Sequence, residues 1–79
     1  MDVLYVGSSG PADPTRASLP LHLAVNGSVA VGQATGVVLA GDATELVLGD
    51  VVDELEGVGL PPLRELAAKA RDQGVPVYV

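Results

Sequence analysis

The sequence predicts a doubly wound, three-layer α/β/α fold around a parallel sheet. Short aliphatic runs alternate with segments of helical periodicity in the order β-α-β-α-β. Crossovers as long as these join parallel strands through right-handed connections. The apolar residues, 48% of the chain, are mainly Val, Leu and Ala, with no Phe or Trp. Continuous runs of such residues are typical of a parallel sheet that is covered on both faces.

The first strand and the first helix follow from the N-terminal residues. Residues 2–6 form a short β-branched and aliphatic run, which predicts a strand, and residues 7–13 have the composition of a loop. Asp13-Pro14 then predicts a helix N-cap followed by proline at the first helical position. Because Pro20 lies inside this helix, we expect a kink there or a restart with Ser18 as the cap.

The second strand is predicted at residues 34–40, through a run of valine and leucine. The next turn has the spacing of a capping box, in which Asp42 accepts a hydrogen bond from the backbone N–H of Glu45 and Glu45 reaches back. A short helix follows, which either runs through Gly49 or restarts after it. Residues 57–60 form a loop.

Residues 61–73 are the best-specified helix, because their apolar residues recur at i, i+3, i+4 and i+7 from Leu63. Glu65 and Lys69 are expected to form a favourable i,i+4 pair on its outer face. Residues 74–79 follow as the third strand. Since the chain ends inside this strand, we interpret the whole chain, residues 1–79, as a single domain and as a truncated layer fold with three strands.

Composition excludes several classes of function. A net charge of −6, from four basic and ten acidic residues, argues against a nucleic-acid partner. Without cysteine the chain has no thiol nucleophile and no thiolate metal site, so we expect no metal, no cofactor and no catalysis of its own. No apolar run approaches the roughly 18 residues of a membrane span, and the first residues lack a signal-peptide pattern. A cytoplasmic protein without membrane contact is expected.

The loops at the carboxyl edge of the sheet are the candidate ligand site, because ligands of open α/β sheets bind beyond the carboxyl ends of the strands. The first loop is rich in small residues and leads into a helix N-terminus, which favours an anion. An ordinary strand-to-helix turn is the alternative, and it is the preferred interpretation because the loop matches neither the phosphate-loop pattern nor the Gly-x-Gly-x-x-Gly pattern. The candidate anion or ligand residues are Ser8, Ser9, Gly10, Thr15, Arg16, Gly41 and Asp42.

The first helix is apolar nearly all round its middle, which predicts burial by the sheet on one side and by a neighbouring subunit on another. Its histidine is expected to be packed and hydrogen-bonded, and its asparagine to satisfy a contact with another helix or subunit. The candidate interface residues are Leu19, His22, Leu23 and Asn26.

Four acidic residues gather between positions 50 and 56. A hard cation is one candidate ligand, but their spacing lacks the Asp-x-Asp-x-Asp-Gly pattern of a calcium loop. A solvated helix face is the preferred interpretation. The residues are Asp50, Asp53, Glu54 and Glu56.

Five segments, in order along nearly the whole chain, carry a resemblance. They are residues 9–17 (SGPADPTRA), 21–27 (LHLAVNG), 39–44 (LAGDAT), 57–63 (GVGLPPL) and 74–79 (GVPVYV). Together they resemble the DsrE/DsrF-like family. The segments are mostly turns and packing positions, and none is a catalytic signature.

This resemblance implies a flavodoxin-like α/β/α fold, assembly into homo- or hetero-oligomers of DsrE-like subunits, and a role in sulfur relay. In characterised members a cysteine accepts a persulfide, in a loop beyond the third strand. This chain ends before that loop, so it corresponds to the N-terminal part of a longer family domain. The predicted function is therefore of the sulfur-relay type without catalysis. The alternatives are a non-enzymatic oligomeric interaction module and a small anion-binding domain.

Overall fold

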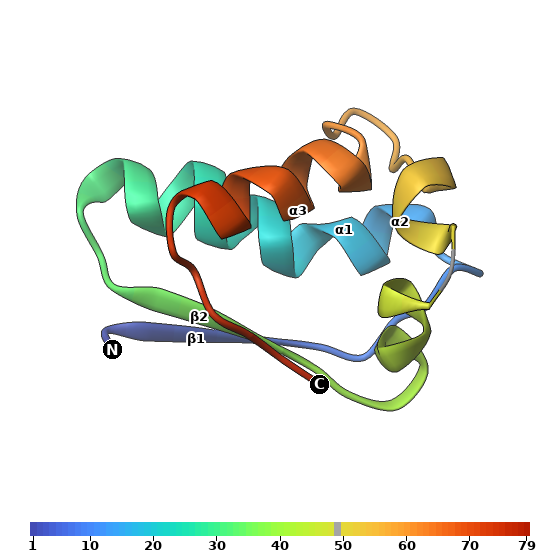
Figure 1. The fold of residues 1–79 in the computed structure, drawn as a ribbon, viewed down its shortest axis with the longest axis horizontal. Helices are drawn as coiled ribbons and strands as arrows, with labels where there is room; N and C mark the ends of the chain where they lie inside the picture. The colour runs from blue at the N-terminus through green and yellow to red at the C-terminus, as the bar shows by residue number, and fades with distance from the viewer. Residues whose placement is uncertain (49) are drawn as a thin grey trace.

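Three short strands form one parallel sheet in the computed structural model, which describes residues 1–48 and 50–79. The strands are β1 (Val3–Gly7), β2 (Thr35–Leu39) and β3 (Val77–Tyr78), in the spatial order β1-β2-β3 (Figure 1). β1 pairs with β2 along its whole length, whereas β3 pairs with β2 only through its two residues. The predicted α/β class, with a parallel sheet in the order β-α-β-α-β, is confirmed.

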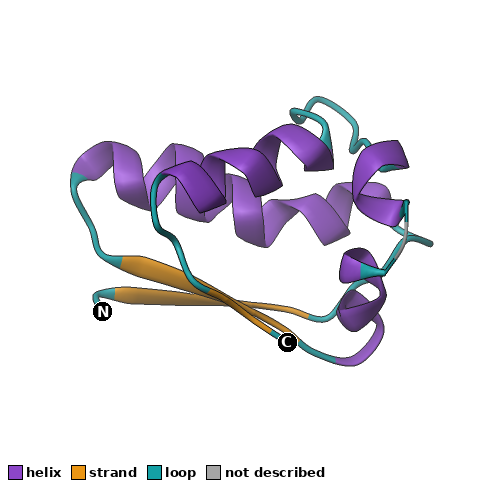
Figure 2. Cartoon of the chain, in the orientation of Figure 1, coloured by secondary structure: helices purple, strands orange, loops and turns teal. Residues whose placement is uncertain are grey.

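Helical segments make up both crossovers (Figure 2). Between β1 and β2 one continuous helical stretch changes its winding twice, and between β2 and β3 three shorter segments follow one another. These segments are α1 (Pro14–His22), the π-helical η1 (Leu23–Ser28), the 3-10 helices η2 (Val29–Val31) and η3 (Gly41–Val47), α2 (Val51–Glu54) and α3 (Leu63–Asp72).

The longer helices cover one face of the sheet only. α1 and α3 both lie on the same side of the strands (Figure 1). Each crossover moves to the next strand in the same direction, and right-handed connections then place both helices on one face. In a flavodoxin-like sheet the first strand lies between the second and third, whereas here β2 is central. The predicted three-layer, flavodoxin-like arrangement is thus corrected to two layers in the described part of the chain.

The core lies between the sheet and this helix layer. Each buried leucine or valine contributes about 1.5–3 kcal/mol relative to an exposed one. The hydroxyl of Tyr5, on the helix-facing side of β1, is hydrogen-bonded to the hydroxyl of Ser28 at 2.7 Å and so ties the strand to η1. The large buried side chains include Leu21, Val25, Val37, Leu39, Leu46, Leu63 and Leu66.

The first crossover begins as predicted but passes Pro20 differently. The Asp13 side chain caps α1 by accepting a hydrogen bond from the backbone N–H of Arg16 at 3.1 Å. The predicted restart at Ser18 is wrong, because its hydroxyl donates to the carbonyl of Pro14 at 2.8 Å and the helix continues. Pro20 has no N–H to donate to the preceding turn, and the winding changes to π-helical three residues later.

The predicted capping box after β2 is wrong. η3 is a 3-10 helix that begins after Ala40 without any side-chain cap, so Asp42 and Glu45 do not cap each other's backbone. Instead the hydroxyl of Thr44 donates to the carbonyl of Gly41 at 2.8 Å. A tertiary contact accounts for the missing capping box, because the backbone at Asp42 packs against the loop that follows β1.

The remaining elements agree with the sequence more closely. The sequence predicted a helix that either runs through Gly49 or restarts after it. In the structure η3 ends at Val47 and α2 begins at Val51, and Gly49 itself lies outside the described residues. The loop at 57–60 and the helix after it are confirmed. Strand β3 is shorter than predicted, because the N–H of Val75 still bonds to the last turn of α3.

Candidate functional site

The loops that follow β1 and β2 meet at the carboxyl edge of the sheet, as the parallel topology predicts. The N–H of Ala40 donates to the carbonyl of Gly7 at 2.8 Å. Gly10 lies so close to the second loop that an added Cβ would sit 2.5 Å from the carbonyl oxygen of Asp42. Gly10, Gly41 and Asp42, which were predicted to share a site, therefore do lie together.

The geometry of this edge does not favour an anion. The carboxylate of Asp13 already accepts the hydrogen bond from the N–H of Arg16 and lies 3.6 Å from its Nε. A negative charge therefore occupies the start of α1 and repels another. Thr15 faces elsewhere, because its hydroxyl oxygen accepts a hydrogen bond from the N–H of Val58 at 3.0 Å. These contacts favour the alternative of an ordinary strand-to-helix turn, and the anion site at Ser8 and its neighbours stays a prediction.

His22 and Asn26 take part in a contact between helices. The side-chain nitrogen of Asn26 lies 3.1 Å from Nδ1 of His22, and the ammonium group of Lys69 donates to the side-chain oxygen of Asn26. This chain of polar groups joins η1 to α3 and matches the predicted packed, hydrogen-bonded histidine. The predicted Glu65–Lys69 ion pair is absent from the described residues because Lys69 turns to Asn26 instead.

Leu19 and Leu23 are the other two residues of the predicted subunit interface. We call its four residues, Leu19, His22, Leu23 and Asn26, the helix stripe. Both remain partly open to solvent, at 38% and 44% exposure. They flank the hydrogen-bonded His22 and Asn26 on the same side of the helix. This stripe is thus available to a partner, but two of its four residues already have partners inside the chain.

The acidic residues around α2 are exposed, as a solvated helix face would be. Asp50 precedes α2 without capping it through its side chain, and Asp53, Glu54 and Glu56 are open to solvent. Within residues 1–48 and 50–79, no group of three or more His, Asp or Glu side chains is arranged to hold a metal ion.

A continuous apolar surface lies on the sheet face that the helices leave open. Alternate residues of a strand point to opposite faces, so Val3 and Tyr5 face the helices while Leu4 and Val6 face away. Leu4 and Val6 are 51% and 64% exposed. We call this surface the bare sheet face, and its residues are Met1, Leu4, Val6, Val38 and Tyr78.

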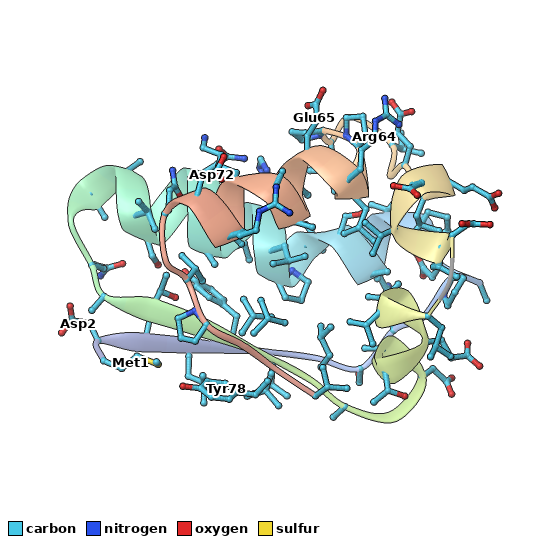
Figure 3. The ribbon with its side chains drawn as sticks, viewed as in Figure 1. Met1, Asp2, Arg64, Glu65, Asp72 and Tyr78 are labelled. Atoms are coloured by element: carbon cyan, nitrogen blue, oxygen red, sulfur yellow. The ribbon has the colours of Figure 1, made fainter. Side chains whose placement is uncertain are left out.

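The strand register makes the bare sheet face one patch. Val6 lies opposite Val38, which in turn lies opposite Tyr78. The Met1 side chain covers Gly36, where an added Cβ would sit 2.8 Å from Cε of Met1. Figure 3 shows Met1 and Tyr78 projecting from the side of the sheet opposite to the helices. Contiguous exposed apolar patches mark interaction sites in soluble proteins.

This face was missed from the sequence because the strands looked covered on both sides. Leu4 and Val6, on the open face, are as apolar as Val3 on the covered face. A run without polar alternation is also the pattern of a doubly covered parallel strand. The distinction depends on where the second helix layer lies, and no local pattern encodes that.

An apolar cavity of about 280 Å³ lies beside the outer strand, β3. Leu39 and Val77 contribute to its sheet side, residues of α1, η3, α2 and α3 line the rest, and one side is open to solvent. Of the described residues that line it, Arg71 alone carries a charge. The lining residues are Leu21, Leu39, Leu46, Val47, Val52, Leu63, Ala67, Ala70, Arg71, Val75 and Val77.

Comparison with known proteins gives no assignment: no protein-family model, no curated protein and no solved structure matches this chain. The DsrE/DsrF-like resemblance therefore stays a prediction, and the function has to be argued from the surfaces above. None of the helices in the described part of the chain has both the length and the apolar character needed to cross a bilayer.

Proposed function

We propose that this protein is a non-enzymatic interaction module that pairs with a second copy of itself through the bare sheet face. The observation that supports this proposal is the exposure of large aliphatic and aromatic side chains on a sheet that is covered on one side only. Burial of apolar surface of this kind contributes a favourable free energy of roughly 25 cal/mol for each Å² removed from water.

The area of the face suits a weak dimer. From the exposed fractions of Met1, Leu4, Val6 and Tyr78, the bare sheet face presents at most roughly 500 Å² per copy, so that stacking two copies buries at most roughly 1,000 Å². Specific interfaces begin at about this size. We therefore expect a dissociation constant in the micromolar range and not a permanent dimer.

A second copy is the occupant that the charge distribution favours. The chain carries a net charge of −6, yet no charged side chain belongs to the bare sheet face. Asp2, next to it in the chain, lies at the amino edge of the sheet, where its carboxylate accepts a hydrogen bond from the N–H of Ala34 at 2.9 Å (Figure 3). Two copies related by a twofold axis can stack face to face at about 10 Å without opposing like charges.

The proposal also fits the resemblance to the DsrE/DsrF-like family, which implies oligomers. Within a sulfur-relay system the module would serve as an assembling subunit. None of the 79 residues is cysteine, so they supply no thiol to carry a persulfide.

Sedimentation velocity tests the proposal, at protein concentrations from about 10 µM to about 1 mM. Val6→Lys places a charge in the bare sheet face and is expected to raise the dissociation constant at least about tenfold. Leu23→Lys is the matched control, since it also replaces an exposed aliphatic residue, and it is expected to leave association unchanged.

Two results would contradict the proposal. The first is an unmodified chain that remains monomeric over the whole concentration range. The second is a loss of association in Leu23→Lys but not in Val6→Lys. The second result would move the interface to the helix stripe at Leu19 and Leu23. Circular dichroism of both variants verifies that they are folded.

A further inference from the structure

We propose that the apolar cavity beside β3 binds a medium-chain carboxylate, with the hydrocarbon tail inside the cavity and the carboxylate on Arg71. This site lies on the helix side of the sheet and is separate from the bare sheet face. The proposal is therefore independent of self-association.

The lining of the cavity selects a hydrocarbon over water. Val47, Ala67 and Val77 border it from η3, from α3 and from β3, over leucine side chains of the buried core. A bound water needs two to four polar partners, and apart from Arg71 the lining residues in the described part of the chain have aliphatic side chains. An apolar tail fills such a space without losing any hydrogen bond.

The volume of the cavity is sufficient for a hydrocarbon tail. A space of about 280 Å³ is larger than an apolar cavity of roughly 150 Å³ that binds benzene. A tail of about eight to ten carbons is less than twice the size of benzene and therefore suits this space. Each methylene group that enters strengthens binding roughly fourfold, so affinity is expected to rise from hexanoate to decanoate and to level off beyond it.

Arg71 supplies the charge that a carboxylate head needs. Its side chain is 79% exposed and lies in the last turn of α3. The Nε atom is 3.9 Å from a carboxylate oxygen of Asp72, a long and solvated ion pair that stabilises little. The guanidinium can therefore turn to a ligand and bind its carboxylate through two parallel N–H···O bonds.

The experiment is a titration of the isotopically labelled protein with decanoate below its micellar concentration, followed by NMR. We expect decanoate to shift the signals of Leu39, Ala67 and Val77. Hexanoate is expected to bind more weakly than decanoate, and decanol, which lacks the charge, about tenfold more weakly. A titration that moves signals elsewhere, or shows no dependence on chain length, would overturn the proposal.

Two matched pairs of variants on α3 test the head and the tail separately. Arg71→Gln is expected to weaken decanoate binding about tenfold, while Arg64→Gln, with the same charge change outside the cavity, leaves it unchanged. Ala67→Leu fills the cavity and abolishes binding, whereas Ala68→Leu, next to it but outside the lining, does not.

Equal effects within either pair would overturn the assignment. If Ala67→Leu failed to fold, the Arg71 pair would still decide it. Val6→Lys is expected to bind decanoate normally, which separates this site from self-association.

Discussion

Thr35 is buried in β2, and its hydroxyl oxygen has no hydrogen-bond partner in the part of the chain that the structure describes. A buried hydroxyl without a partner costs free energy, because it loses its hydrogen bonds to water. Thr35→Val keeps the shape and the β-branched character of the side chain and removes that polar group. We expect the variant to raise the free energy of unfolding by about 1 kcal/mol in urea denaturation.

Thr44→Val is the control for this prediction. The hydroxyl of Thr44 donates to the carbonyl of Gly41, so the same exchange is expected to lower the free energy of unfolding by about 0.5–1.5 kcal/mol. A loss of stability in Thr35→Val as well would mean that the hydroxyl of Thr35 has a partner after all.

At the scale of single residues, the sequence predicted roles that depend on near neighbours in the chain. The N-cap at Asp13 follows from the proline after it, and the structure confirms it. The close approach of Gly10 to the backbone of Asp42 joins two loops that are distant in the sequence. The pairing of Lys69 with Asn26 in place of Glu65 likewise depends on a helix contact. No local spacing reports such contacts.

At the scale of elements, the start of α1 and the start of η3 offer a direct comparison. Both begin near an aspartate, but only Asp13 caps its helix through the side chain. Asp13→Ala is expected to lower the free energy of unfolding by about 1 kcal/mol. Asp42→Ala is expected to change it by no more than about 0.5 kcal/mol. Urea denaturation of both variants measures the difference, and equal losses would contradict the cap assignment.

The elements that the sequence predicted well are those with strong local patterns. The third helix has regular apolar spacing and a glycine after its end, and the structure has it as α3. The two failures have different causes. The restart at Ser18 fails for a local reason, because its hydroxyl donates to the carbonyl of Pro14 one turn back and the helix continues. The capping box at Asp42 and Glu45 fails where the backbone of Asp42 packs against the loop that follows β1.

At the scale of the whole molecule, the α/β class was predictable and the layer arrangement was not. Periodicity and crossover length predict that the strands are parallel, but they do not predict the order of the strands in the sheet. The strand order decides whether consecutive crossovers lie on one face or on both. With β2 in the centre, both lie on one face, and the bare sheet face is the consequence.

Stacking of two copies through the bare sheet face can be observed by isotope-filtered NMR on a mixture of labelled and unlabelled protein at about 1 mM, where a micromolar dimer is populated. The expected result is a set of intermolecular contacts between the methyl groups of Leu4 and Val6 and the ring of Tyr78. Contacts only from Leu19 and Leu23, or no intermolecular contact, would contradict the proposed stacking.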